Sequence, residues 1–259
     1  MPTASCHRVD HAAYCDAVAA EAERFVEAVR GLDPAARVPT CPEWSAADLM
    51  EHTGTVHRWA GNQVAVLTEK RIPSDQMELG VPAEPSGFPD WLSEGGRFVV
   101  DALRNQDPDA SMWAWGSDQH VRFWSRRMLH ETAVHRADAE FTAGLKPEIA
   151  REVAVDGIDE FLDNLPHARR FAPRVAEILG TGERLCFRAS DAGVAWTITL
   201  EHERFAWDHA DTGSEVTAQS DASDLALLVY GRLDPGDAAR FTVEGDHALL
   251  AFWRERSSI

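Results

Sequence analysis

The 259-residue sequence has little positive charge, few cysteines and no long hydrophobic run. It contains 25 lysine and arginine residues against 43 aspartate and glutamate residues, which gives a formal net charge of -18. Binding to nucleic acid depends on basic side chains that neutralise phosphates, so this balance argues against a general nucleic-acid-binding protein. An acidic surface mainly favours solubility.

Hydrophobic segments of membrane-spanning length are absent from the sequence. No apolar run approaches the roughly 20 residues that such a helix needs, and the first ten residues, MPTASCHRVD, lack the apolar core of a signal peptide. We therefore predict a cytoplasmic protein that binds neither membrane nor nucleic acid. The cysteines are scattered, without metal-binding spacing or a disulfide framework, and we expect free thiols. They are Cys6, Cys15, Cys41 and Cys186. No sequence pattern indicates the oligomeric state.

The first half of the chain has the periodicity of amphipathic helices. The predicted helices span residues 11–31, 45–70, 90–106 and 121–144, with a proline- and glycine-rich loop at 72–89. Ser45 and Asp48 form a near capping box at the start of the second helix. Four helices predict a bundle, and bundles build metal sites from inward-facing side chains of neighbouring helices.

The second half of the chain contains short β-rich runs separated by turn residues, a pattern typical of antiparallel strands. The runs are RLCFRAS, VAWTITLE, RFAWDHAD, SEVTAQS and RFTVEG, and the segments DASDLALLVYGR and DHALLAFWRE are predicted helices. Between the halves, EIAREVAVDGIDEFLDNL is also helix-like. We predict an N-terminal bundle over residues 1–146 and a smaller α+β domain with an antiparallel sheet over residues 147–259.

The fourth predicted helix contains the segment RRMLHETAVHRAD, residues 126–138. His130 and His135 are five residues apart and point about 140° from each other on a helix, so they cannot easily share one ion. The motif of zinc proteases requires histidines four residues apart, with a free glutamate between them. Glu131 and His135 are four residues apart, about 40° around the helix, and can chelate a metal from one face.

A third ligand is expected on the second predicted helix, where His52 and His57 are the candidates. An isolated histidine on a mixed helix face is more often a surface residue or a hydrogen-bonded core residue than a ligand. Helical spacing alone leaves this choice open.

The segments TCPEWSAADLMEHTGTVHRW and FWSRRMLHETAVHRAD together resemble the mycothiol-dependent maleylpyruvate isomerase family. The segment DASDLALLVYGR resembles the smaller C-terminal domain of that family, so the resemblance covers nearly the whole chain. It implies a DinB-like four-helix bundle, followed by a domain related in form to sterol carrier proteins.

The family pattern consists of C-P-x-W, a histidine on the following helix, and H-E-x-x-x-H-R-x-D. The resemblance implies that His52, Glu131 and His135 are the metal ligands and that His57 is a residue of the helix face. Ala137 stands where the family often has an aromatic residue, a difference that bears on the shape of the pocket rather than on metal binding.

Two imidazoles and one carboxylate leave a coordination position open, as in catalytic zinc sites, although iron, nickel or cobalt would accept the same ligands. A thiol entering that position loses its proton. In the family this thiol is mycothiol, which replaces glutathione in actinobacteria. The resemblance implies cis–trans isomerisation by reversible thiolate addition to an electrophilic small molecule. A thiol S-transferase, a metal-stabilised ligand-binding protein without turnover and a metal-free pseudo-enzyme stay open as alternatives.

Asp138 and Arg232 are the predicted catalytic residues outside the ligand set. Asp138 could accept the second imidazole N–H of His135, although a solvated acid or an ion pair with Arg136 is an equal alternative. Arg232, in the second domain, could anchor a substrate carboxylate. The arginines considered for the same role, each more often a surface residue, are Arg126, Arg127 and Arg136.

Two further groups of residues have structural rather than catalytic explanations. Cys41 has no base beside it in the sequence, so a small thiol that shapes a loop is a better interpretation than a nucleophile. The tryptophans of SMWAWGSDQHVRFW could line a pocket, but core packing is at least as good an explanation. They are Trp113, Trp115 and Trp124.

Overall fold

The computed structural model describes residues 10–259, so Cys6 lies outside the described residues. The chain divides into two compact units. The first extends to Pro147 except for Trp115–Ser117, and the second contains those three residues and Glu148–Ile259. In the described part of the chain, every helix is too short or too polar to cross a membrane.

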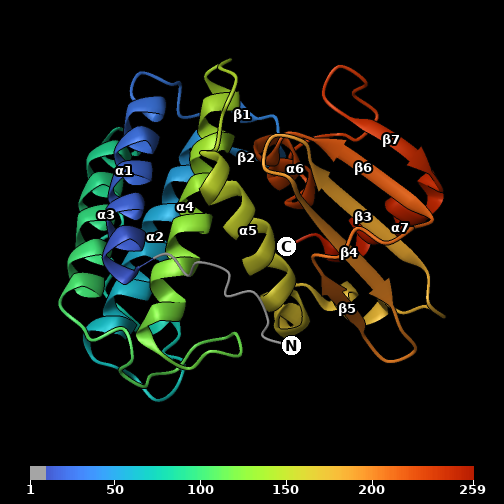
Figure 1. Cartoon of the computed structure of the whole chain (residues 1–259). Helices are drawn as coiled ribbons and strands as arrows, with labels where there is room; N and C mark the ends of the chain where they lie inside the picture. Colours follow the sequence, from blue (N-terminus) through green and yellow to red (C-terminus); the bar gives the residue numbers. More distant parts are fainter. Residues whose placement is uncertain (1–9) are drawn as a thin grey trace. The chain divides into compact units, whose positions relative to one another are not determined.

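The first unit is a bundle of four helices, as the sequence predicted (Figure 1). The helices are α1 (His11–Val29), α2 (Ala46–Ala65), α3 (Phe88–Arg104) and α4 (Val121–Thr142). The predicted capping box is present, because Ser45 and Asp48 exchange side-chain and backbone hydrogen bonds at the start of α2. The helix ends at Ala65, earlier than the predicted residue 70.

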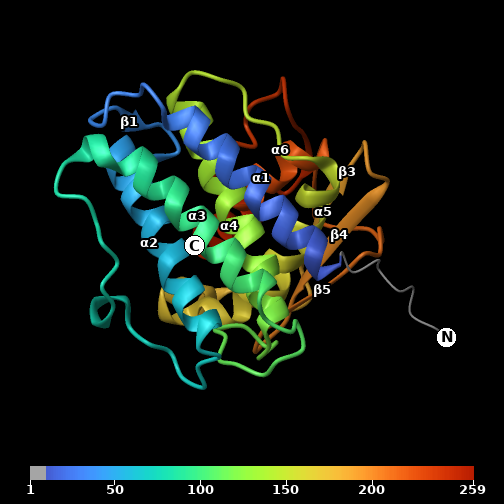
Figure 2. The same ribbon diagram turned by 90° about the vertical axis from the view of Figure 1, so that its left-hand side faces the viewer.

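Figure 2 shows the helices α1 to α4 running alongside one another. They pack through small residues as well as through large apolar ones. The main contacts join α1 to α4 and α2 to α3. A Cβ on Gly54 of α2 would collide with the Trp91 ring of α3, and one on Gly96 of α3 would press on Ala22 of α1. Glycine therefore allows a close helix approach at these two positions, and this packing offsets its low helix propensity.

The connections in the bundle are largely irregular, as predicted for the segment between α2 and α3. That segment contains only two short 3-10 turns, Ser74–Gln76 and Pro85–Gly87. Between α1 and α2 the structure has a small antiparallel hairpin, formed by β1 (Arg37–Val38) and β2 (Cys41–Ser45), which the sequence analysis treated as a loop. These two strands are too short, and the segment is too rich in proline, for the sequence to show the alternation of apolar and polar residues that predicts a strand.

The second unit is an α+β domain. It begins with α5 (Arg151–Asn164) and the 3-10 segments Leu165–Arg170 and Pro173–Glu177. The strands are β3 (Arg184–Ala189), β4 (Val194–Leu200), β5 (Phe205–Asp208), β6 (Val216–Ser220) and β7 (Thr242–Gly245). The remaining helices are α6 (Ala222–Val229) and α7 (His247–Ser257).

The five strands form one sheet in the order β5-β4-β3-β6-β7. Three of the four pairings are antiparallel, but β3 and β6 are parallel, with Leu185 opposite Val216. The sheet is therefore mixed rather than purely antiparallel. After β5 the chain crosses back to the free edge of β3, where β6 pairs with it in parallel. This direction could not be predicted, because the alternating pattern of a single strand carries no information about the direction of its neighbour.

Candidate metal centre

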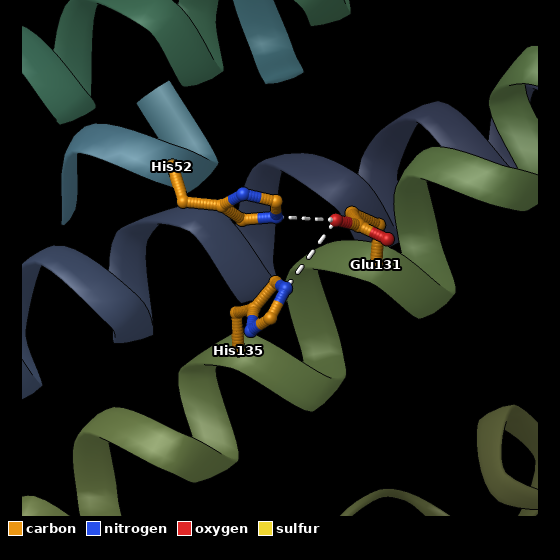
Figure 3. Close-up of side chains that lie close together, drawn as sticks. All are labelled: His52, Glu131 and His135. Atoms are coloured by element: carbon orange, nitrogen blue, oxygen red, sulfur yellow. Dashed lines mark hydrogen bonds and ion pairs between the residues drawn. The ribbon is translucent and has the colours of Figure 1, made fainter. Parts of the chain in front are cut away.

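The structure brings His52, Glu131 and His135 together from two helices (Figure 3). The Nε2 atoms of both histidines lie 3.3 Å from the same oxygen, Oε1 of Glu131. One donor atom of each residue lies within 4.8 Å of those of the other two. Glu131 and His135 share a face of α4 because they are four residues apart, and His52 reaches them from α2.

The protonation of this cluster is coupled to its burial and its hydrogen bonds. Burial by itself would raise the pKa of Glu131, but His135, His52 and Arg127 together hold that pKa well below its usual value. Burial would also lower the pKa of His135, but hydrogen bonds to Asp138 and Glu131 outweigh it and raise the pKa. The arrangement thus stabilises positive charge between the three side chains, and a divalent cation fits this donor set.

Two residues orient the side chains from α4. Asp138 is fully buried, and its Oδ2 lies 2.9 Å from Nδ1 of His135, so it accepts that N–H and leaves the Nε2 lone pair toward the cluster. Arg127 donates through Nη2 to Oε2 of Glu131 at 3.2 Å. Sequence analysis considered Arg127 only as a substrate anchor, although its spacing of four residues from Glu131 could have indicated this pair.

The β1–β2 hairpin packs against the cluster and supplies contacts that the sequence analysis missed. The Thr40 hydroxyl donates to Oδ1 of Asp138 at 2.5 Å, and the Cys41 thiol lies 3.9 Å from Oδ2. The Trp44 ring lies 4.8 Å from the His52 ring and 5.8 Å from the His135 ring, measured between centroids. The hairpin therefore both positions Asp138 and covers the two imidazoles.

An open hollow of about 540 Å³ gives solvent access to the cluster from the side of His52. It is lined by Glu43, Trp44, Asp48, Glu51, His52 and Thr55. The His52 side chain is 38% exposed, whereas that of His135 is 8% exposed. A small molecule can therefore approach the cluster beside His52.

Two family models match most of the chain. The model "Mycothiol maleylpyruvate isomerase N-terminal domain" matches residues 15–140, and "MDMPI C-terminal domain" matches residues 152–252. The chain belongs to the mycothiol-dependent maleylpyruvate isomerase family. This confirms the resemblance on which the sequence-based ligand set depended.

Solved structures with the fold of the maleylpyruvate isomerase family are also similar to the chain. The crystal structure of the mycothiol-dependent maleylpyruvate isomerase is 11% identical, with 92% of this chain and 94% of that chain covered and a TM-score of 0.60. A mutant of that isomerase gives the same identity and coverage with a TM-score of 0.59. At this identity the likeness shows a shared fold. A search of curated protein sequences finds no match.

Three other residues of the segments that carry the family resemblance do not join the cluster of His52, Glu131 and His135. His57 is fully buried and its Nε2 lies 2.9 Å from the Thr132 hydroxyl. His130 is 2% exposed and lies outside the three-residue cluster. Arg136 is also fully buried, where it binds Glu21 and Glu140, so it is not available to anchor a substrate.

The remaining candidates from the sequence analysis are Arg232 and the tryptophans. Arg232 follows α6 in the second unit, is half-buried, and donates to the Tyr230 carbonyl at 2.7 Å; its catalytic role stays a prediction. Trp124 is fully buried and packs against Trp59 and Trp113, as expected for core packing. Trp115 belongs to the second unit and contacts Phe171 there.

Loss of the hydrogen bond between His135 and Asp138 is expected to weaken the binding of a divalent metal at this candidate centre about 10- to 100-fold, since partners of ligand histidines typically contribute that much, and loss of the bond between Thr40 and Asp138 should have a smaller effect in the same direction. Thr40→Val and Asp138→Asn test this, with the zinc affinity measured by competition with a chelator. Thr142→Val is the matched control, because the Thr142 hydroxyl donates to the backbone oxygen of Asp138 rather than to its carboxylate. Equal affinities for Thr40→Val and the wild type would rule out this positioning role.

Acid sensitivity of the bundle is expected from His57. Burial lowers the pKa of His57 from 6.5 to about 4. Between these two pH values the unfolded chain binds a proton at His57 that the folded protein does not bind. The contribution of His57 to the free energy of unfolding is therefore fully present above pH 6.5 and is lost as the pH falls toward 4. The loss is about 3 kcal/mol at 1.36 kcal/mol per pH unit.

The measurement for His57 is the free energy of urea unfolding of metal-free protein as a function of pH. His57→Gln lacks the titrating group and should show a flatter dependence between pH 6.5 and 4 than the wild type. Two parallel curves would show that this histidine does not cause the acid sensitivity.

Proposed function

We propose that the protein is a mycothiol-dependent metalloenzyme that catalyses the cis–trans isomerisation of an electrophilic small molecule of the maleylpyruvate type. The single observation that carries this proposal is the convergence of His52, Glu131 and His135 beside an open hollow. Two imidazoles and a carboxylate are the ligand set of catalytic zinc sites, so zinc is the proposed metal. Membership of the family supports mycothiol as the thiol.

When bound, a divalent metal would lower the pKa of an incoming thiol and so supply a thiolate near neutral pH. Several residues of this chain orient the donor atoms that would hold the metal. Glu131 is held ionised, Asp138 fixes the Nδ1–H tautomer of His135, and Arg127 orients the carboxylate. Trp44 covers the imidazoles on the side of the hairpin. Asp138 acts through His135, and is in this sense a positioning residue.

The test is an assay of thiol dependence with zinc-loaded protein. Electrophiles with a cis double bond are offered with mycothiol and without any thiol, and both the isomer and the thiol concentration are followed. An isomerase yields the trans product without consuming mycothiol. Accumulation of a mycothiol conjugate would instead identify an S-transferase. Absence of any thiol-dependent reaction in protein shown to contain zinc would reject the proposal.

A further inference from the structure

The two oxygens of the Glu131 carboxylate face different partners. Oε1 lies 3.3 Å from Nε2 of His52 and 3.3 Å from Nε2 of His135, so it faces the point where the three donors converge (Figure 3). Oε2 lies 3.2 Å from Nη2 of Arg127 and accepts a hydrogen bond from it. The carboxylate is therefore shared between the candidate metal centre and an arginine.

Arg127 makes this contact from a buried position. It lies on α4, four residues before Glu131, and 5% of its side chain is exposed. This spacing places both residues on one face of the helix, so the pair forms through local geometry and needs no bound metal. Removing one partner from a buried ion pair is costly, because little water is present to replace it. Rotation of Oε2 away from Arg127 is therefore unfavourable.

The position of Oε2 matters because a carboxylate can bind a metal ion through one oxygen or through both. Zinc in catalytic sites has three protein ligands and keeps a fourth position for water or substrate. If both oxygens of Glu131 bound the ion together with His52 and His135, the protein would fill the fourth position. The open position that thiol activation requires thus depends on Oε2 being held elsewhere.

The positive charge of Arg127 is compatible with a metal ion beside it. Glu131 and Asp138 each bring a negative charge to the cluster, and Arg127 offsets one of the two. With neutral imidazoles, the cluster then has one net negative charge without metal and one net positive charge with a divalent ion. A single thiolate neutralises that charge. The carboxylates of the adjacent hollow are exposed, so water and salt screen them.

We propose that Arg127 is a positioning residue that holds Glu131 to a single metal-binding oxygen and so keeps one coordination position open for the thiol. The proposal rests on the proposed function, because it concerns the same metal centre. Arg127 acts through Glu131 and sets the number of protein donor atoms around the ion. This role differs from that of a substrate anchor.

The first test is the crystal structure of the zinc-loaded protein, as the wild type and as Arg127→Met. In the wild type, one oxygen of Glu131 should lie about 2.0–2.2 Å from the zinc, with the other outside bonding distance and still held by Arg127. In Arg127→Met both oxygens should bind the zinc, because Oε2 has lost its donor. Reduced stability alone would leave the second oxygen in its wild-type position.

A second readout measures the open position in solution, without turnover. Cobalt(II) accepts the same ligands as zinc, and its visible spectrum changes when an added ligand binds. Imidazole is the probe, because it is neutral and its affinity depends on a vacant position rather than on charge. Its dissociation constant should rise about tenfold in Arg127→Met, as for other residues that orient a metal ligand.

Two further variants test whether the effect belongs to this arginine. Arg127→Lys keeps a charged donor without the planar fork, so its imidazole affinity should lie between those of the wild type and Arg127→Met. Arg122→Met is the matched control, because Arg122 is on the same helix but pairs with Asp109 and Asp118 outside the cluster. It should bind imidazole as the wild type does. Cobalt content is measured for every variant.

The outcomes separate this proposal from the proposed function. A zinc-loaded wild type with both oxygens of Glu131 on the zinc would overturn the role of Arg127, and this result holds even if no Arg127 variant folds. Equal imidazole affinities in the wild type and Arg127→Met would overturn it too, while leaving thiol activation intact. If both readouts behave as expected but mycothiol supports no reaction, the proposed function fails and the role of Arg127 stands. A wild type that binds neither zinc nor cobalt would reject both.

Discussion

Replacement of His135 by alanine is expected to remove zinc from the protein and to lower thiol-dependent activity at least about a thousandfold. The variant loses one of the three donors that converge within 4.8 Å. A metal contributes several kcal/mol to catalysis by stabilising charge, and about 4 kcal/mol corresponds to a thousandfold change in rate. The measurements are elemental analysis of the purified protein and the initial rate with mycothiol.

A second ligand variant distinguishes loss of the metal from loss of folding. His135→Ala also deprives the buried Asp138 of a partner, so it costs stability as well as metal. Glu131→Gln keeps the volume of the side chain while removing its charge, and it should lose zinc in the same way. His57→Gln is the matched control, since His57 lies on α2 outside the cluster and should retain zinc. Full zinc content in both ligand variants would refute the proposed centre.

Replacement of Arg136 by methionine is expected to destabilise the protein by about 3–5 kcal/mol, the usual cost of removing one partner from a buried ion pair. Arg136 is fully buried and binds Glu21 and Glu140 at 2.7 Å each. Arg24 also forms ion pairs with these two carboxylates, but its side chain is 44% exposed and compensates their charge less well. The free energy of urea unfolding measures the loss.

The origin of this loss can be separated from a packing defect. The triple variant Arg136→Met/Glu21→Gln/Glu140→Gln removes the uncompensated charges and should recover part of the stability. Zinc content should stay at the wild-type level, because this network lies outside the metal cluster. A loss below 1 kcal/mol in Arg136→Met, or no recovery in the triple variant, would contradict a dominant role for the buried charge.

Positions within one helix were well predicted from the sequence. A spacing of four residues on α4 places Glu131 and His135 on one face wherever the helix lies in the fold. The same local geometry separated His130 from His135. The contacts of the hairpin with the cluster were not predicted, because Thr40 and Trp44 reach the site only through the packing of β1 and β2 against α4.

The sequence by itself determined the helices, the strands of the second unit, the capping box of α2 and the shared face of Glu131 and His135 on α4, since each depends on neighbours within a few residues. Tertiary structure decided which histidine of α2 meets that pair, which arginine is buried against acids, and that β3 and β6 run parallel. These outcomes depend on how separate elements pack. Periodicity within an element carries no information about the partner that its face will meet.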